Sequence, residues 1–129
     1  MRIDDEEEIN RMGEKRFKEF LENLEKEAQR GNEKAAFHLA ELYQEGLGVE
    51  PNIIKAIKYY RIAAIKNHED ANKQLALIYM VGEDVYPQIE RDDNKAKKYI
   101  EKVRLIKEKK RLKMVNYFNY FNYLFIYFY

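Results

Sequence analysis

The side chains that could do chemistry in this chain are few and scattered. His38 and Glu41 stand three positions apart, which on a helix places an imidazole and a carboxylate on one face. A metal site or an acid–base pair needs at least one further converging polar group, and none is evident in the sequence. The chain contains no cysteine and no serine, which excludes thiolate sites and serine nucleophiles. We therefore expect a protein that is not an enzyme, with no catalytic, cofactor-binding or metal-binding residues.

Three further polar features have simple structural explanations. His68 is expected at a helix end, where it can interact with the negative end of the helix dipole. The Asp-Asp-Asn run at 92–94 resembles the front of a calcium loop, but no glycine or twelfth-position glutamate follows in register, so a helix cap is predicted. No strand precedes Gly46 and Gly48, and helix termination explains both glycines better than a phosphate-binding loop does.

The elements that position these residues come from an internal repeat. With a shift of 36 positions, like residues coincide, as in Ala35 with Ala71, Leu39 with Leu75, Ala40 with Ala76, Tyr43 with Tyr79, Gly46 with Gly82 and Pro51 with Pro87. Four extra residues then follow in the second copy, and the match resumes at an offset of 40, with Ala56 on Ala96 and Tyr59 on Tyr99. A period in the 30s predicts stacked helical hairpins, none of which can bury its apolar face alone.

Apolar spacing and turn residues give the expected elements. A first helix covers residues 4 to about 30 and ends at Gly31, and the first unit has a helix at 33–45 and a return helix from Pro51-Asn52 to Asn67-His68. The second unit has a helix at 70–81, a loop at 82–92 that holds the insertion, and a helix from 93 to about 110. The predicted fold is all-α, a short α-solenoid of about two and a half repeats. Its segments are an N-terminal cap or partial repeat (1–33), two repeats (34–70 and 71–104) and a basic, then aromatic tail (105–129).

One family carries this pattern. The run from Ala35 through Leu39-Ala40, Leu42-Tyr43, Gly46 and Gly48-Val49, continued by Lys55-Ala56, Tyr59-Tyr60 and Ala63-Ala64, closely resembles the Sel-1-like repeat, a relative of the tetratricopeptide repeats. The second unit matches it less well, with Asp84 at the second loop glycine. This resemblance covers roughly residues 20–104 and implies an α-solenoid that acts as an adaptor or scaffold for other proteins. The matched residues are structural in that family.

A partner is expected to bind where first helices leave residues outside the core. The expected partner-binding residues are His38, Glu41, Glu45, Gln74, Leu77 and Met80, with Gln44 beside them. Leu77 and Met80 are the most informative, because apolar residues beside polar ones suit a peptide or a partner helix. The alternative is that both pack against the basic helix that follows. The partner is then another protein or peptide, and no nucleic acid is expected.

Charge and aromatic residues are concentrated at the ends of the chain. Residues 1–10 carry a net charge of −4 and residues 102–113 a net charge of +6, although the whole chain carries only +1. The acidic start is unlike a secretory signal, so a cytoplasmic protein is expected.

The tail after residue 116 holds 9 of the 18 aromatic residues and is too short to span a bilayer. Three interpretations stay open. Residues 102–129 bind a membrane surface, or the tail forms an additional helix that closes the last repeat, or it is unselected low-complexity sequence.

Overall fold

The computed structural model describes the backbone of residues 3–128 and the side chains of residues 6–128. The described residues form α1 (Ile3–Gln29), α2 (Glu33–Glu45), α3 (Ile53–Ile65), α4 (Glu69–Val81), the short 3-10 helix η1 (Gly82–Asp84) and α5 (Asp93–Phe128), and no strand occurs among them. The predicted all-α solenoid is confirmed. Residues 1, 2 and 129 of the predicted end segments, and the side chains of Asp4 and Asp5, lie outside this description.

Side-chain caps start the helices of the two units. The amide oxygen of Asn32 accepts from the Ala35 N–H (3.1 Å), and that of Asn52 accepts from the Lys55 N–H (3.0 Å). A carboxylate oxygen of Asp92 accepts from the Lys95 N–H (2.9 Å), so the predicted capping role of the acidic 92–94 run is confirmed. Each cap satisfies an amide that has no partner inside its own helix.

His68 occupies a different helix end from the one that the sequence indicated. It is the N-cap of α4, and its Nδ1 accepts from the Ala71 N–H at 3.2 Å. The expected interaction with the negative end of a helix dipole is therefore wrong, because this imidazole lies at a positive end and acts as an acceptor. The turn between α3 and α4 is so short that one residue both follows α3 and starts α4.

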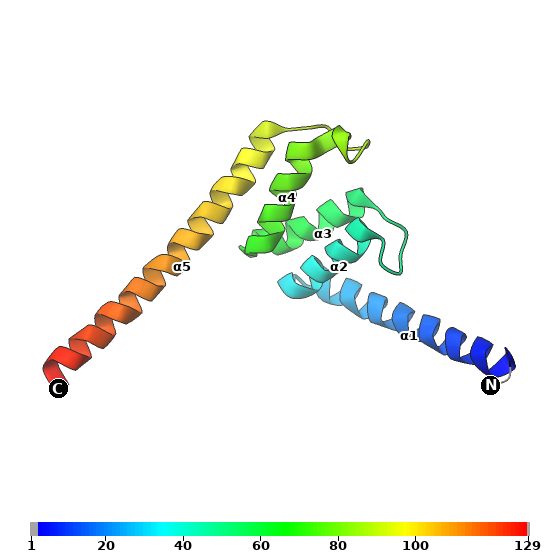
Figure 1. The fold of residues 1–129 in the computed structure, drawn as a ribbon, viewed down its shortest axis with the longest axis horizontal. Coiled ribbons are helices and arrows are strands. Elements are labelled where there is room, and N and C mark those ends of the chain that lie inside the picture. The colour runs from blue at the N-terminus through cyan, green and yellow to red at the C-terminus, as the bar shows by residue number, and fades with distance from the viewer. Residues whose placement is uncertain (1–2, 129) are drawn as a thin grey trace.

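The last helix is far longer than predicted. α5 continues through Phe128 instead of ending near Lys110. The sequence between Asp93 and Phe128 contains neither glycine nor proline, so nothing stops the helix where its composition changes from basic to aromatic. The interpretation of the tail as an additional helix closing the last repeat is therefore wrong. Residues 109–123 are all exposed, and the tail extends α5 away from the other helices (Figure 1).

The two hairpins repeat each other down to individual contacts. Tyr43 and Tyr59 stack in the first unit (α2 and α3) with ring centroids 6.0 Å apart, and their equivalents Tyr79 and Tyr99 stack at 6.1 Å in the second (α4 and α5). A lysine ammonium lies 5.0 Å from the first ring of each pair. A backbone hydrogen bond also closes each loop at equivalent positions: Asn52 N to Tyr43 O (2.8 Å) and Asp92 N to Tyr79 O (2.9 Å).

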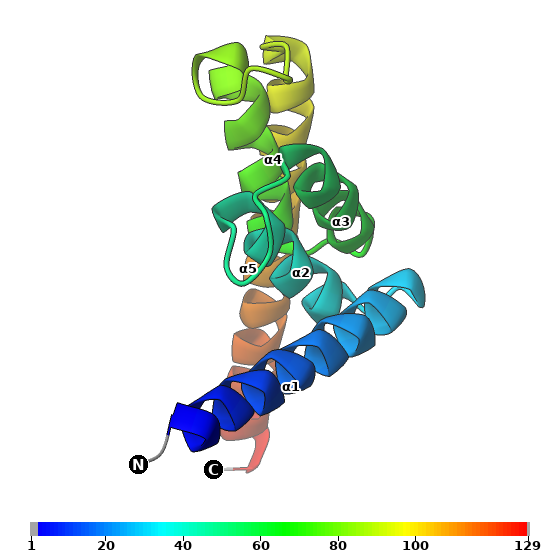
Figure 2. The ribbon, with the colours of Figure 1, turned by 90° about the vertical axis from the view of Figure 1, so that its right-hand side faces the viewer.

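Alanines allow the central helices to approach closely. The buried core includes Ala36, Ala40, Ala56, Ala63 and Ala71, each fully inaccessible to solvent. Leucine, isoleucine and tyrosine side chains fill the remaining volume. α1 packs on α2 through its second half, so its first half and the end of α5 project from the central helices (Figure 1), and α4 lies beside the first half of α5 (Figure 2).

Gly82 provides a test of the second loop. Its backbone has φ +48°, and a Cβ there would lie 2.5 Å from the Cα of Arg91, whose N–H donates to Glu83 (2.6 Å). Gly82→Ala should therefore lower the free energy of unfolding by about 1–3 kcal/mol. Gly13→Ala is the matched control, because a Cβ at Gly13 meets nothing within 4 Å. Urea denaturation of both variants measures the difference, and equal stability of the two would contradict this view of the loop.

Candidate functional site

The six expected partner-binding residues all lie on the first helices of the two units. His38, Glu41 and Glu45 are on α2, and Gln74, Leu77 and Met80 are on α4. We call these six residues the first-helix face. Each of them is exposed or half-buried, since the opposite side of each helix forms the core. All six side chains therefore reach the surface, although they do not form one uniform face, and their role in binding stays a prediction.

The α2 part of the first-helix face is polar. The His38 ring lies edge-on to Phe20 of α1, with centroids 6.1 Å apart and an interplanar angle of 90°. The pKa of Tyr60 is raised, chiefly because its hydroxyl is buried and further because the Glu41 and Glu45 carboxylates lie near it. The carboxylates of Glu41 and Glu45 therefore place negative charge near the Tyr60 hydroxyl of α3.

Gln44 has a structural role. Its side-chain oxygen accepts from the Tyr60 hydroxyl, and its nitrogen donates to the Tyr86 hydroxyl at 2.9 Å. The glutamine thus connects α2, α3 and the loop after η1, and both of its polar atoms have protein partners. It is held between the units and is less available to a ligand than its neighbours Glu41 and Glu45.

The α4 part of the first-helix face is apolar and opens into a groove. Leu77 and Met80 are 51% and 44% exposed. They line a groove of about 360 Å³ between α4 and α5, together with Lys73, Ala76, Ile100 and Val103. We call this the end groove, defined by these six residues. Leu77 and Met80 therefore face α5, the basic helix against which the alternative interpretation expects them to pack. They remain about half exposed, so α5 does not cover them.

The other four residues of the end groove are not among the expected partner-binding residues. Lys73 and Ala76 have no predicted site, and Ile100 and Val103 lie on a helix for which the sequence suggests membrane binding and no protein partner. A usable signal was present in the repeat itself. Under the offsets of 36 and 40, the positions equivalent to these four residues are Phe37, Ala40, Tyr60 and Ala63, which lie where the next unit packs.

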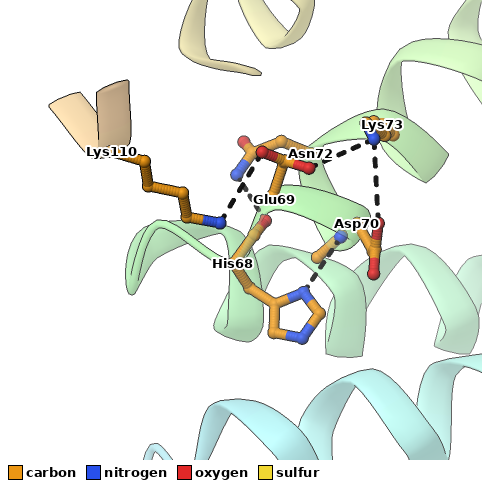
Figure 3. A network of polar contacts seen from close by, with 7 residues as sticks. His68, Glu69, Asp70, Asn72, Lys73 and Lys110 are labelled. Carbon is orange, nitrogen blue, oxygen red and sulfur yellow. Dashed lines mark hydrogen bonds and ion pairs between the residues drawn. The ribbon is translucent and has the colours of Figure 1, made fainter. Parts of the chain in front are cut away.

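Charged residues of α4 and α5 lie close together at the start of α4 (Figure 3). Glu69 lies between Lys73 of its own helix (3.2 Å) and Lys110 of α5 (3.7 Å). The hydrogen bond from Lys73 and the positive charge of Lys110 lower the pKa of Glu69. An acidic residue in the first turn also suits the positive end of the α4 dipole. The basic stretch of α5 thus passes directly beside the N-terminus of α4.

The described part of the chain offers little for other kinds of chemistry. Among its residues, no three histidine, cysteine or acidic side chains gather closely enough to hold a metal ion. None of the helices within residues 3–128 combines the length and the apolar character needed to cross a bilayer.

Comparisons with known proteins agree with this architecture. The family model of the Sel1 repeat matches residues 33–68 and 70–102. A solved structure of a protective antigen from uropathogenic Escherichia coli, displaying an SLR fold, is similar with a TM-score of 0.57 and 25% identity, over 63% of this chain and 17% of the antigen. A Sel1 repeat protein from Oxalobacter formigenes is similar with a TM-score of 0.55 and 26% identity, over 66% of this chain and 61% of that protein. No curated protein matches significantly.

The chain thus spans less than two thirds of the length of either solved relative. The matched residues are the two hairpins from α2 to the first third of α5, which are also the residues that repeat each other's contacts. Proteins built from this repeat are generally scaffolds for protein interactions and are typically non-catalytic. Since the matched repeats cover more than half of its residues, this chain belongs to the Sel1 repeat family.

Proposed function

We propose that this protein is a non-catalytic scaffold or adaptor that binds a partner protein or peptide through the first-helix face. In this proposal residues 1–33 cap the array, residues 34–70 and 71–104 are its two units, and residues 105–129 extend from it. The observation that carries the proposal is the exposure of Leu77 and Met80 on α4, with the carboxylates of Glu41 and Glu45 on the first helix of the preceding unit.

The composition of the face indicates the chemistry of its partner. Full burial of an exposed leucine or methionine contributes about 1.5–3 kcal/mol, and because Leu77 and Met80 are about half exposed, each can contribute about half of that when a partner covers it. The α2 part of the same face contributes Glu41 and Glu45, which favour a basic segment at that end of the partner. A partner with an apolar segment followed by lysine or arginine therefore fits the face better than a uniformly acidic or uniformly apolar one.

Two substitutions test the face. Leu77→Asp and Glu41→Arg should each weaken binding at least tenfold, because the first removes apolar contact and the second reverses a charge. The partner is isolated by affinity capture with the full chain and purified, and its affinity for each variant is then measured by calorimetry.

Glu22→Arg is the matched control for the charge reversal. Glu22 is exposed on α1 and lies outside the first-helix face, so its reversal should leave the affinity unchanged. Unchanged affinity for both Leu77→Asp and Glu41→Arg would rule out this face. Equal losses for Glu41→Arg and Glu22→Arg would show that net charge alone governs binding.

A second candidate function is supported by the length of α5. One exposed helix carries the basic residues 102–113 and then the aromatic residues 117–128. Each lysine or arginine near an anionic membrane contributes about 1 kcal/mol, and aromatic side chains prefer the interface between water and lipid. In this alternative the scaffold is held peripherally at a membrane surface by residues 102–129.

Vesicle binding tests the alternative. The full chain should co-sediment with phosphatidylserine-containing vesicles, should remain soluble with neutral phosphatidylcholine vesicles, and should lose binding when truncated after Arg104. Circular dichroism of the truncated chain checks that the two units remain folded. Co-sedimentation that survives the truncation, or that is equal for both vesicle types, would reject an electrostatic anchor in this segment.

A further inference from the structure

The end groove of the second unit has an exact counterpart in position within the first unit. Under the two offsets, its six residues correspond to Phe37, Ala40, Glu41, Gln44, Tyr60 and Ala63. The equivalence holds in space as well as in sequence, because the tyrosine stacks, the lysine contacts and the loop-closing hydrogen bonds of the two units coincide. The element that packs on the groove of the first unit therefore indicates which kind of element can bind in the end groove.

In the first unit a helix covers this groove. His68, the N-cap of α4, stacks on Phe37 with ring centroids 4.5 Å apart. The side-chain nitrogen of Asn72 on α4 donates to the carbonyl oxygens of His68 (2.8 Å) and Ala64 (3.5 Å). Tyr60, at the bottom of the groove, keeps only 1% of its surface exposed. The helix at the first groove is thus α4, which packs on α3 and reaches Phe37 of α2 through its N-cap His68.

In the second unit the same groove is open. Ile100, which stands where the buried Tyr60 stands in the first unit, is 49% exposed. α5 continues straight on, so that within residues 3–128 no helix turns back to cover the groove as α4 does. The groove has also become more apolar, because Met80 replaces Gln44 and Leu77 replaces Glu41. An apolar helix face suits it better than α4 would.

We propose that the end groove binds α1 of a second copy of this chain. The first half of α1 projects beyond α2 (Figure 1), and residues 6–16 are all exposed. Ile9 and Met12 lie three positions apart on this free part of the helix and are 57% and 50% exposed. Gly13 lies beside them, and the space around it is open, so a second helix can approach the backbone closely there.

Charge complementarity favours this occupant and fixes its direction. A helix parallel to α4 begins beside the basic stretch of α5, since Lys110 already contacts Glu69 at the start of α4 (3.7 Å). That stretch, residues 102–113, carries a net charge of +6. α1 begins with the acidic residues 4–8, in a decapeptide of net charge −4. In a parallel arrangement the acidic start of one chain therefore meets the basic stretch of its neighbour.

The resulting contact is head-to-tail. One chain contributes α1 to the contact and the other contributes the end groove, so the interface is heterologous. Further copies can therefore join in a row, unless the assembly closes into a ring. This inference goes beyond the proposed function and shares Leu77 and Met80 with it. Ile9 and Met12 lie outside the first-helix face, so variants of α1 test self-association without altering partner binding.

Sedimentation velocity of the full chain tests the proposal. The mean mass of the wild-type chain should rise with concentration up to about 1 mM, a range that detects even weak association. Met80→Glu, which blocks the groove, and the double variant Ile9→Glu/Met12→Glu, which blocks α1, should each raise the dissociation constant at least tenfold. An equimolar mixture of the two variants should form a 1:1 dimer and no larger species, because one intact groove meets one intact α1.

Ile126→Glu is the matched control, since Ile126 is also exposed but lies near the end of α5, well beyond the basic stretch. Its association should equal that of the wild-type chain. A wild-type chain that stays monomeric, a mixture that stays monomeric, or association lost in Ile126→Glu would each overturn the proposal. Circular dichroism confirms that every variant keeps its helices. The proposed function is tested separately. If Leu77→Asp loses partner binding and Ile9→Glu/Met12→Glu keeps it, the proposed function stands even when the chain does not self-associate.

Discussion

A helical hairpin of this size buries one face by itself and needs a neighbouring helix to bury the next. Here α1 packs on α2, and α4 packs on α3, with its N-cap His68 stacked on Phe37 of α2. Fully buried alanines such as Ala40 and Ala63 let these helices approach closely, and Tyr60 fills the space between them. The second hairpin obeys the same requirement but lacks its covering helix among the described residues. The open groove between α4 and α5 is thus a consequence of the repeat.

The two units share the same core contacts and differ in the residues at their exposed positions. Tyrosine stacks, capping residues and loop closures coincide, whereas Glu41 becomes Leu77 and Gln44 becomes Met80. These changes move the exposed side of the first helices from acidic to apolar along the array. A scaffold acquires specificity in this way, because substitutions at exposed positions alter the partner without disturbing the core. Charge also differs between the two ends of the chain, because α1 begins with acidic residues and α5 contains the basic stretch.

The sequence was sufficient to predict the helices of both units and most of their caps, because Asn52, Gly46 and Asp92 act locally. The prediction for His68 is wrong because the turn after α3 is so short that His68 already caps α4. The predicted end of α5 is wrong because the change from basic to aromatic composition brings no helix-breaking residue. The end groove was not predicted either. Leu77 and Met80 were selected from α4 alone, whereas the groove depends on Ile100 and Val103 and on which equivalent positions a neighbour covers. Such information lies in tertiary packing.

The central claim is that the groove left open by the repeat takes a helix, and methionine methyl groups report on it directly. The chain has 4 methionines: Met1, Met12 on α1, Met80 in the end groove and Met114 on the far part of α5. With methyl-labelled methionine, NMR spectra of the full chain are recorded over a series of concentrations. Binding of α1 in the end groove predicts that the Met12 and Met80 signals shift together along one binding curve, and by more than the Met114 signal. A Met80 signal that does not move, or a shift confined to Met114, would contradict it.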